Sequence, residues 1–427
     1  MSAPPLPRFF GLRQSFSRSA PINLEAALGP AIESLAKGLR PGARVAVGVG
    51  SRGIANLATI VTHVVSALQK AGAAPFIVPA MGSHGGATPD GQLRILADYG
   101  VTEHSAGAPI RAAMETRAVG RNSLGMEVMM GTEALDADAI LPINRIKPHT
   151  DFQGGLGSGI VKMLVVGCGK HAGASGFHRS AMRLGYEEAL REAAAIILQH
   201  TPVLGGVALV EDAHHQTAAV EIVQPDDFIA AEERLQSTAR NLMPGLPFDD
   251  LDLLIVDRIG KNISGTGMDT NVIGRGVHGY STHFGEQAKA GFPCIKRILV
   301  RDLTPETHGN AIGIGMADFT TDRLLEKTDR PATNVNSLTA TTLHAAKLPI
   351  SFPTDREAIT KALGSLGLPA DSPARVLRIR DTLSLESMRA SEALLQATLD
   401  REDLQACSEP EAPEFDDAGQ LRDLPAS

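Results

Sequence analysis

The sequence predicts an α/β fold built as two lobes. Short runs of β-branched and aliphatic residues recur between longer segments with helical periodicity, and this alternation is typical of strands that are each followed by a covering helix. A stretch rich in Pro and Gly, residues 243–247, interrupts one helical pattern and precedes a new apolar run. Because such stretches favour linkers, we place a domain boundary there, which suits a chain of 427 residues.

The same two patterns predict each element in chain order. Aromatic and aliphatic residues between 9 and 16 predict an opening strand, although the arginines and serines before Glu25, the first acid, are also typical of an organelle transit peptide. Further strands are predicted at 44–49, 74–79, 139–144, 207–210, 251–257, 297–301 and 376–380. Helices are predicted at 24–38, 54–71, 89–98, 186–199, 226–241, 356–363 and 384–399. The predicted domains are 1–245 and 246–400, followed by 401–427 as an acidic, disordered tail.

Charge and cysteine content exclude several classes of protein. The formal net charge is −8, and eight acids against two arginines in residues 401–427 account for most of it, so no basic face favours a nucleic-acid partner. The three cysteines are scattered and form no CxxC pair, which argues against a disulfide framework or a thiolate zinc site and favours a reducing, cytoplasmic setting. No stretch approaches the roughly 20 apolar residues of a membrane span, so no membrane partner is expected.

The first candidate site is a GxGxxG string at residues 48–53, which follows a predicted strand and precedes a predicted helix. Ser51 and Arg52 lie within it, and free N–H groups with an arginine suit a phosphate or carboxylate. A dinucleotide site also needs an acid after the next strand, and residues 76–81 contain none. The alternatives are therefore an anion site or a plain strand-to-helix turn with a surface arginine.

The second candidate is His84, which stands in a glycine-flanked turn just after the strand predicted at 74–79. The carboxyl end of such a strand is where open α/β sheets bind ligands, and the glycines allow a ligand to approach closely. A loop histidine that is merely exposed is the alternative.

The third candidate combines His149, in the sequence Lys-Pro-His, with the Gly-rich loop 154–159 around Gly155, with Lys162 and with His178. The loop has the composition to pass under a phosphate or a planar ligand. Lys162 lies in an apolar run, where a bare ammonium is costly to bury. Either the amine reaches solvent at the edge of a helix or strand, or a partner or a covalent modification neutralises it.

Taken in order, His84, His149, Lys162 and His178 with their neighbouring residues resemble the lactate racemase family, over about residues 10–400. The resemblance implies a nickel-pincer nucleotide cofactor, pyridinium-3-thioamide-5-thiocarboxylic acid mononucleotide, bonded covalently to Lys162, with His178 as the nickel ligand. It implies His84 and His149 as the catalytic acid/bases, and an active site in the cleft between the two lobes. Domain 1–245 would bind the cofactor, aided by Ser51 and Gly155, and domain 246–400 would close the cleft.

The reaction implied is racemisation or epimerisation of a small 2-hydroxy acid, by reversible hydride transfer to the pincer. Two bases on opposite faces are what such a reaction needs, and the usual pKa of imidazole, about 6.5, suits the role. Nickel completed by one imidazole is consistent with a soft ligand set. Enzymes that synthesise the cofactor are the expected protein partners.

The sequence also departs from the family pattern. Gly85 stands where founding members commonly carry an arginine, and the chain has no tryptophan, so a substrate other than lactate is expected. Arg52 corresponds to an arginine near the substrate carboxylate, and Lys261 and Asn262 in a Gly-rich loop of the second lobe are further predicted substrate contacts, against the alternative of a surface loop. A metal site at 211–215 is a weaker candidate, as is the turn around His308. A nicotinamide-dependent dehydrogenase and a non-catalytic carboxylate binder are the competing functions.

Overall fold

The computed structural model describes residues 5–51, 53–278, 292–369 and 372–424, in two compact units. One unit comprises Ser17–Met243, and the other joins the described residues up to Phe16 to those from Pro244 onward. The break after Met243 lies close to the predicted domain boundary. The described residues up to Phe16 differ from the prediction of a domain at 1–245. They belong to the other unit, because β1 (Phe9–Gln14) pairs with strands near the C-terminus.

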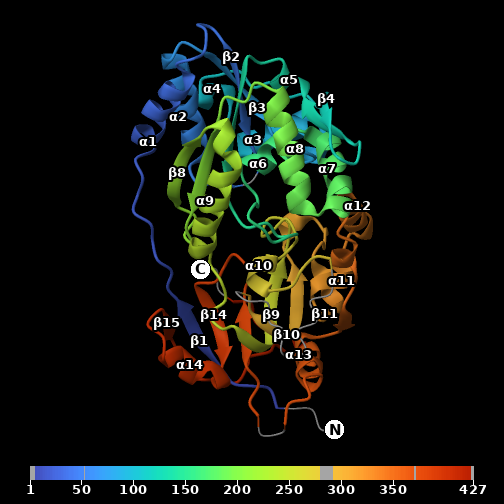
Figure 1. Cartoon of the computed structure of the whole chain (residues 1–427). Helices are drawn as coiled ribbons and strands as arrows, with labels where there is room; N and C mark the ends of the chain where they lie inside the picture. The colour runs from blue at the N-terminus through green and yellow to red at the C-terminus, as the bar shows by residue number, and fades with distance from the viewer. Residues whose placement is uncertain (1–4, 52, 279–291, 370–371, 425–427) are drawn as a thin grey trace. The chain divides into compact units, whose positions relative to one another are not determined.

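The unit Ser17–Met243 is built on a five-stranded sheet of order β3-β2-β6-β7-β8, in which only β8 is antiparallel to its neighbour (Figure 1). Apolar residues run almost unbroken through its central strands, as expected where helices cover both faces of a parallel sheet. Its strands are β2 (Arg44–Val49), β3 (Ala74–Pro79), β6 (Ala139–Arg145), β7 (Gly206–Glu211) and β8 (Thr217–Val223). A separate hairpin consists of β4 (Thr116–Arg121) and β5 (Glu127–Gly131).

Helices pack on both faces of this sheet because successive strand residues point in opposite directions. Val45 and Val47 face a core formed with α1, α2, α3 and α4, whereas Ala46 faces a core formed with α6, α7, α8 and α9. The helices of this unit are α1 (Leu24–Ala36), α2 (Leu57–Lys70), α3 (Pro89–Asp98), α4 (Glu103–Ala106), α5 (Thr132–Leu135), α6 (Ile160–Lys162), α7 (Lys170–Leu184), α8 (Tyr186–His200) and α9 (Phe228–Leu242).

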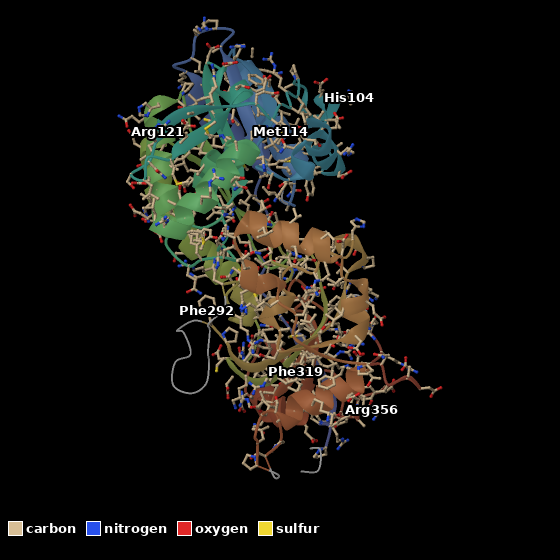
Figure 2. The ribbon with its side chains drawn as sticks, turned by 90° about the vertical axis from the view of Figure 1, so that its right-hand side faces the viewer. His104, Met114, Arg121, Phe292, Phe319 and Arg356 are labelled. Carbon is tan, nitrogen blue, oxygen red and sulfur yellow. The ribbon has the colours of Figure 1, made fainter. Side chains whose placement is uncertain are left out.

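The second unit contains an eight-stranded sheet of order β12-β11-β10-β9-β13-β14-β1-β15. The strands from β12 to β13 are parallel, and β14, β1 and β15 extend the sheet antiparallel. Phe319, labelled in Figure 2, belongs to the core under α13. The bounds are β9 (Asp250–Ile259), β10 (Cys294–Leu303), β11 (Phe319–Thr321), β12 (Ile350–Phe352), β13 (Val376–Ile379), β14 (Ser387–Ser391), β15 (Leu404–Ala406), α10 (Thr270–Ile273), α11 (Asp322–Lys327), α12 (Arg330–Ala340), α13 (Asp355–Gly364) and α14 (Leu395–Leu399).

The helix predicted at 384–399 is wrong over its first half, which forms β14. Met388 and Ala390 are buried while Ser387 is exposed, which is the period-2 pattern of a strand, and β14 pairs with both β13 and β1. Only the last five residues of the predicted segment, α14, form an α-helix. Pairing on two sides thus overrides the helical propensity of this short segment.

The disordered tail predicted at 401–427 is also wrong for its described residues. β15 pairs with β1, Glu411 bridges to Phe9, and Leu421 is buried. The tail's Asp423 pairs with Arg258 at 2.6 Å. Asp423 also lies 3.5 Å from Arg301, so one of the acids that make the tail resemble a solvated extension is matched by arginines from distant parts of the chain. No helix among the described residues is long and apolar enough to cross a membrane.

Candidate active site

The strand order of the five-stranded sheet indicates a candidate binding site at one edge of the sheet. After β2 the chain moves to β3 on one side, and β6 then pairs with the other side of β2. Open α/β sheets bind ligands outside the carboxyl ends of the strands at such a reversal. Ser51 follows β2, His84 follows β3 and His149 follows β6. The two histidines therefore come from the strands that flank β2.

Ser51 and His84 are in direct contact. The Ser51 hydroxyl forms a hydrogen bond with Nδ1 of His84, and both side chains are half-buried. The two turns also contact the segment that follows α6: the N–H of Gly82 donates to the carbonyl of Gly167 at 3.1 Å, and a Cβ added at Gly50 would lie 2.7 Å from the end of the Met163 side chain. The structure therefore brings the first two predicted motifs together against the segment that contains Lys162.

His149 and Lys162 are the second contact of the site. Lys162 Nζ is hydrogen-bonded to Nε2 of His149, a residue that is only 7% exposed. The N–H of Asp151 donates to Nδ1 of His149 at 3.0 Å, which fixes the ring with Nε2 facing Lys162. The chain between them is a closed loop, because the backbones of Lys147 and Ser158 exchange two hydrogen bonds of 2.8 Å.

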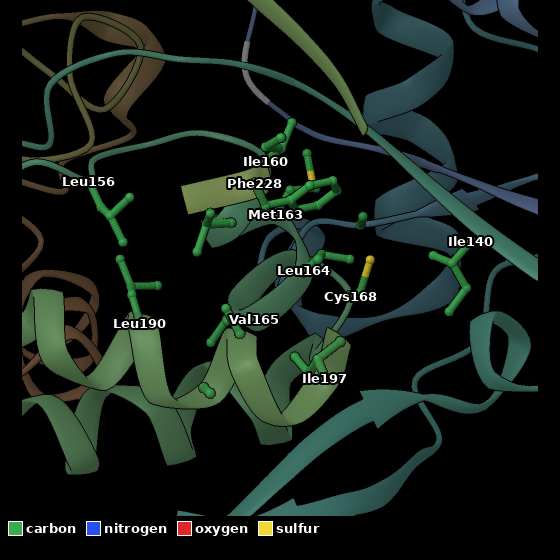
Figure 3. Packing of buried hydrophobic residues seen from close by; sticks show 14 of the residues in the cluster. Ile140, Leu156, Ile160, Met163, Leu164, Val165, Cys168, Leu190, Ile197 and Phe228 are labelled. Atoms are coloured by element: carbon green, nitrogen blue, oxygen red, sulfur yellow. The ribbon is translucent and has the colours of Figure 1, made fainter. Parts of the chain in front are cut away.

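The local fold explains how a lysine is accommodated in an apolar run. Ile160, Val161 and Leu164 are fully buried, whereas Lys162 is half-buried and reaches His149. Figure 3 shows Ile160 and Leu164 within the core that contains Phe228. α6 continues as a π-helical turn, Met163–Gly167, a conformation that is frequent at functional sites. The amine thus lies at the rim of the core.

His178 on α7 belongs to the same cluster. The pKa of His178 is lowered to about 4, mainly by burial and also by the positive charge of Lys162, while Asp151 acts in the opposite direction. Burial raises the pKa of Asp151, but the positive forms of His149, Lys162 and His178 outweigh it and hold that pKa below its usual range. Lys162 and His178 are therefore close enough to interact electrostatically.

Aromatic contacts hold the rings of His149 and His178, and one nitrogen of His178 makes no hydrogen bond within the described residues. Phe152 stacks on His149 with ring centroids 4.6 Å apart and on Tyr186 at 5.2 Å, and Tyr186 meets His178 edge-on at 6.2 Å. The Nδ1 atom of His178 is buried and has no hydrogen-bond partner within the described part of the chain. In the tautomer that carries its proton on Nε2, this nitrogen has a lone pair for a ligand.

A buried carboxylate supports the backbone that carries Lys162. Glu232, on α9, is 0% exposed and accepts hydrogen bonds from the N–H groups of Val161 at 2.9 Å and Gly157 at 3.4 Å. A Cβ added at Gly159 would lie 2.3 Å from the carboxyl carbon of Glu232, so this close approach requires glycine. Burial raises the pKa of Glu232 to about 7, although these backbone donors and Lys162 lower it.

This carboxylate also changes the interpretation of the Gly-rich loop 154–159. Its N–H groups at Gly157 and Gly155 donate to Glu232 and Glu187, so acidic side chains of the chain occupy the place in which the sequence predicts a ligand phosphate. The role of Gly155 in cofactor binding stays a prediction, and its N–H is engaged at 3.2 Å with Glu187.

The titration of Glu232 predicts a pH dependence of stability. In the folded chain its pKa is about 7, against 4.5 for an unperturbed glutamate. The native state therefore binds more protons between these values, and stability falls as pH rises through this window and is level above it. The contribution is about 3 kcal/mol. We expect urea unfolding from about pH 4.5 to about pH 7.5 to show this decline in the wild type relative to Glu232→Gln.

Glu233→Gln is the matched control, since Glu233 is the next residue of α9 and its partly exposed side chain pairs with Arg191. It should keep the wild-type slope. An identical slope in wild type and Glu232→Gln would contradict the assignment of the raised pKa to Glu232.

The remaining predicted site residues belong to the other unit or lie outside the described residues. Arg52 lies outside the described residues. Lys261 and Asn262 follow β9 in the other unit, where Lys261 Nζ donates to the carbonyl of Gly265 at 3.0 Å and Asn262 accepts from Thr304 at 2.7 Å. Their contact with a substrate stays a prediction.

The weaker candidates have structural roles. Glu211 accepts from the N–H of Ala55 at 2.6 Å and pairs with Arg145, and Asp212 accepts from the N–H groups of His214 and Ser19. Glu211 therefore occupies an N–H of the turn that precedes α2. Across the described residues, no three His, Cys, Asp or Glu side chains converge on a metal site.

The structure requires glycine at position 85. Gly85 has a φ of +67°, and a Cβ there would lie 2.5 Å from the backbone of Gly91 in α3. The His84 turn packs directly on the first turn of this helix, so a larger side chain at position 85 has no room.

Sequence reasoning missed Asp151, Glu232 and the ring of Tyr186. Asp151 was detectable in principle, because it follows the Lys-Pro-His motif by two residues. Glu232 reaches the site from α9, far along the chain, and Tyr186 from the start of α8, and their identities alone carry no signal of that placement.

Comparisons with known proteins agree with this architecture. The profile of a family described as a domain of unknown function (DUF362) matches residues 51–235, less than half of the chain but all five residues of the cluster from Ser51 to His178. The lactate racemase apoprotein of Thermoanaerobacterium thermosaccharolyticum matches over 87% of this chain and 94% of its own, with a TM-score of 0.50 and 14% identity. This chain is similar in fold to lactate racemase. The predicted α/β fold class is thereby confirmed, while 14% identity shows the fold alone. No curated protein matches the chain.

Proposed function

We propose that the protein is a nickel-pincer nucleotide-dependent racemase or epimerase of a small 2-hydroxy acid. The observation that carries the proposal is the contact between Lys162 and His149, with His178 in electrostatic range of Lys162. The order of these residues resembles the lactate racemase family, and the fold is similar to that of the lactate racemase apoprotein. Fold and site residues thus support the same chemistry.

The residues present fit the proposed cofactor. Lys162 offers an amine at the rim of the core for the covalent bond, and His178 offers a buried ring nitrogen that lacks a hydrogen-bond partner among the described residues. The cofactor itself supplies the other nickel ligands, so one protein imidazole completes the set and no cluster of three protein ligands is needed. When bound, the cofactor supplies the hydride acceptor.

The chain's own residues then handle the proton of the substrate hydroxyl. His149 presents Nε2 at Lys162, and the N–H of Asp151 holds its Nδ1, so Nε2 is the nitrogen that exchanges protons. His84 has its Nδ1 on the Ser51 hydroxyl, and its Nε2 is proposed for the same task. The two imidazoles follow the strands on either side of β2, and each is proposed to serve one face of the planar carbon.

Isomerisation of a 2-hydroxy acid by the loaded protein tests the proposal. The protein is produced together with cofactor-synthesis enzymes, and single stereoisomers of a panel of 2-hydroxy acids are followed by chiral chromatography. We expect the opposite configuration at C2 to appear for at least one acid. A protein that carries the nickel adduct but inverts none of them would contradict the activity, and tight binding of free NAD or NADP would favour a dehydrogenase instead.

A further inference from the structure

Two fully buried polar side chains lie next to the His84 turn and have no part in the proposed chemistry. Lys170 is 1% exposed and Gln92 is 0% exposed. Burying an ammonium group is costly unless hydrogen bonds replace its water. Burial lowers the pKa of Lys170 to about 8, so the amine still carries its proton at neutral pH.

The contacts of this pair lead to the backbone around His84. Lys170 Nζ donates to the carbonyl of Pro79, the last residue of β3, at 2.6 Å and to Oε1 of Gln92 at 3.4 Å. The amide nitrogen of Gln92 donates to the carbonyls of Gly82 at 3.1 Å and His84 at 3.4 Å. One amide therefore spans the turn, and the ammonium joins that amide to the end of the strand.

The pair also connects the turn to the helix that carries His178. Lys170 is the first residue of α7, and its φ of +55° lies in the left-handed region that non-glycine residues rarely adopt. A Cβ added at Gly131 would lie 3.1 Å from Cε of Lys170, so the backbone of β5 packs on the lysine stem. Such a strained conformation persists only where its surroundings hold it.

We propose that Lys170 and Gln92 are positioning residues that fix the His84 turn to the start of α7. His84 then keeps a constant placement relative to the helix of His178. The inference rests on the proposed function for the role of His84, whereas the contacts themselves are independent of it.

Gln92→Glu separates positioning from folding. The carboxylate still accepts from Lys170 but has no N–H for the carbonyls of Gly82 and His84. We expect amide hydrogen exchange in the peptide 81–92 of the apoprotein to accelerate about tenfold or more, without faster exchange across the rest of the unit. In the loaded enzyme, kcat should fall about tenfold to a hundredfold with little change in KM.

Gln69→Glu is the matched control, because Gln69 also donates from its amide to a backbone carbonyl, that of Gly107, on the exposed side of α2. If Gln92→Glu does not fold, Gln92→Asn, whose amide is too short to span the turn, is measured in the same way. Unchanged exchange in 81–92 would overturn the proposal, as would acceleration spread evenly over the unit. Because exchange is measured without cofactor, this result is separate from the success or failure of the racemase proposal.

Discussion

Replacing His149 or His84 by alanine is expected to lower the rate of 2-hydroxy acid isomerisation by about 10²- to 10⁴-fold, the usual contribution of a general acid/base. His149 meets Lys162 through Nε2 while the N–H of Asp151 fixes its ring, and His84 is held by Ser51. Each imidazole is proposed to serve one face of the substrate carbon, so loss of either should block both directions of the reaction.

The measurement is the initial rate of isomerisation at saturating substrate, together with the mass of the Lys162 peptide to show that cofactor loading is intact. His104→Ala is the control, since His104 is exposed on α4 and is labelled in Figure 2. Wild-type rates in His84→Ala or His149→Ala with full loading would exclude that histidine from the chemistry.

Arg301→Met is expected to lower the free energy of unfolding of the C-terminal unit by about 3 kcal/mol, because two buried carboxylates, Asp257 and Asp355, each lose one of their two arginine partners. The side chain of Arg301 is 3% exposed and pairs with Asp257 at 2.8 Å and Asp355 at 2.6 Å. It also donates to the carbonyl of Leu421 at 2.6 Å, which ties the C-terminal segment to the sheet. These carboxylates hold the pKa of Arg301 above its usual range.

Urea unfolding checks this prediction, with Arg258→Met as its control. Arg258 also pairs with the tail, through Asp423, but its side chain is 36% exposed, so its loss should cost about 0–1 kcal/mol. An equal loss of unfolding free energy in the two variants would contradict the prediction, because the buried ion pairs of Arg301 would then contribute no more than the exposed pair of Arg258.

The sheet that carries the site was predictable because its pattern is local. β2 and β3 are continuous apolar runs that end in glycine-containing turns, and their bounds match the predicted 44–49 and 74–79. The positions of Ser51, His84 and His149 just after strands followed from the same pattern. The grouping of His84 and His149 in one site came from the resemblance to the lactate racemase family, and both residues follow strands that flank β2.

The features that the sequence did not predict depend on contacts between residues that are far apart in the chain. α7 was missed because it contains Gly173 and Gly176, which weaken the helical pattern, and its glycines allow close packing on β5. The tail resembled a disordered segment because its acids are visible locally, whereas Arg301 and Arg258 lie more than a hundred residues away. Glu232 and Gln92 act on the site through backbone contacts that no motif records.

The most direct test of the account is the mass and nickel content of the Lys162 peptide from protein produced with the cofactor-synthesis enzymes. The account predicts a nickel-containing adduct on Lys162, retained in His84→Ala and lost in Lys162→Arg, with nickel diminished in His178→Ala. An unmodified Lys162 in protein from cells that make the cofactor would contradict it.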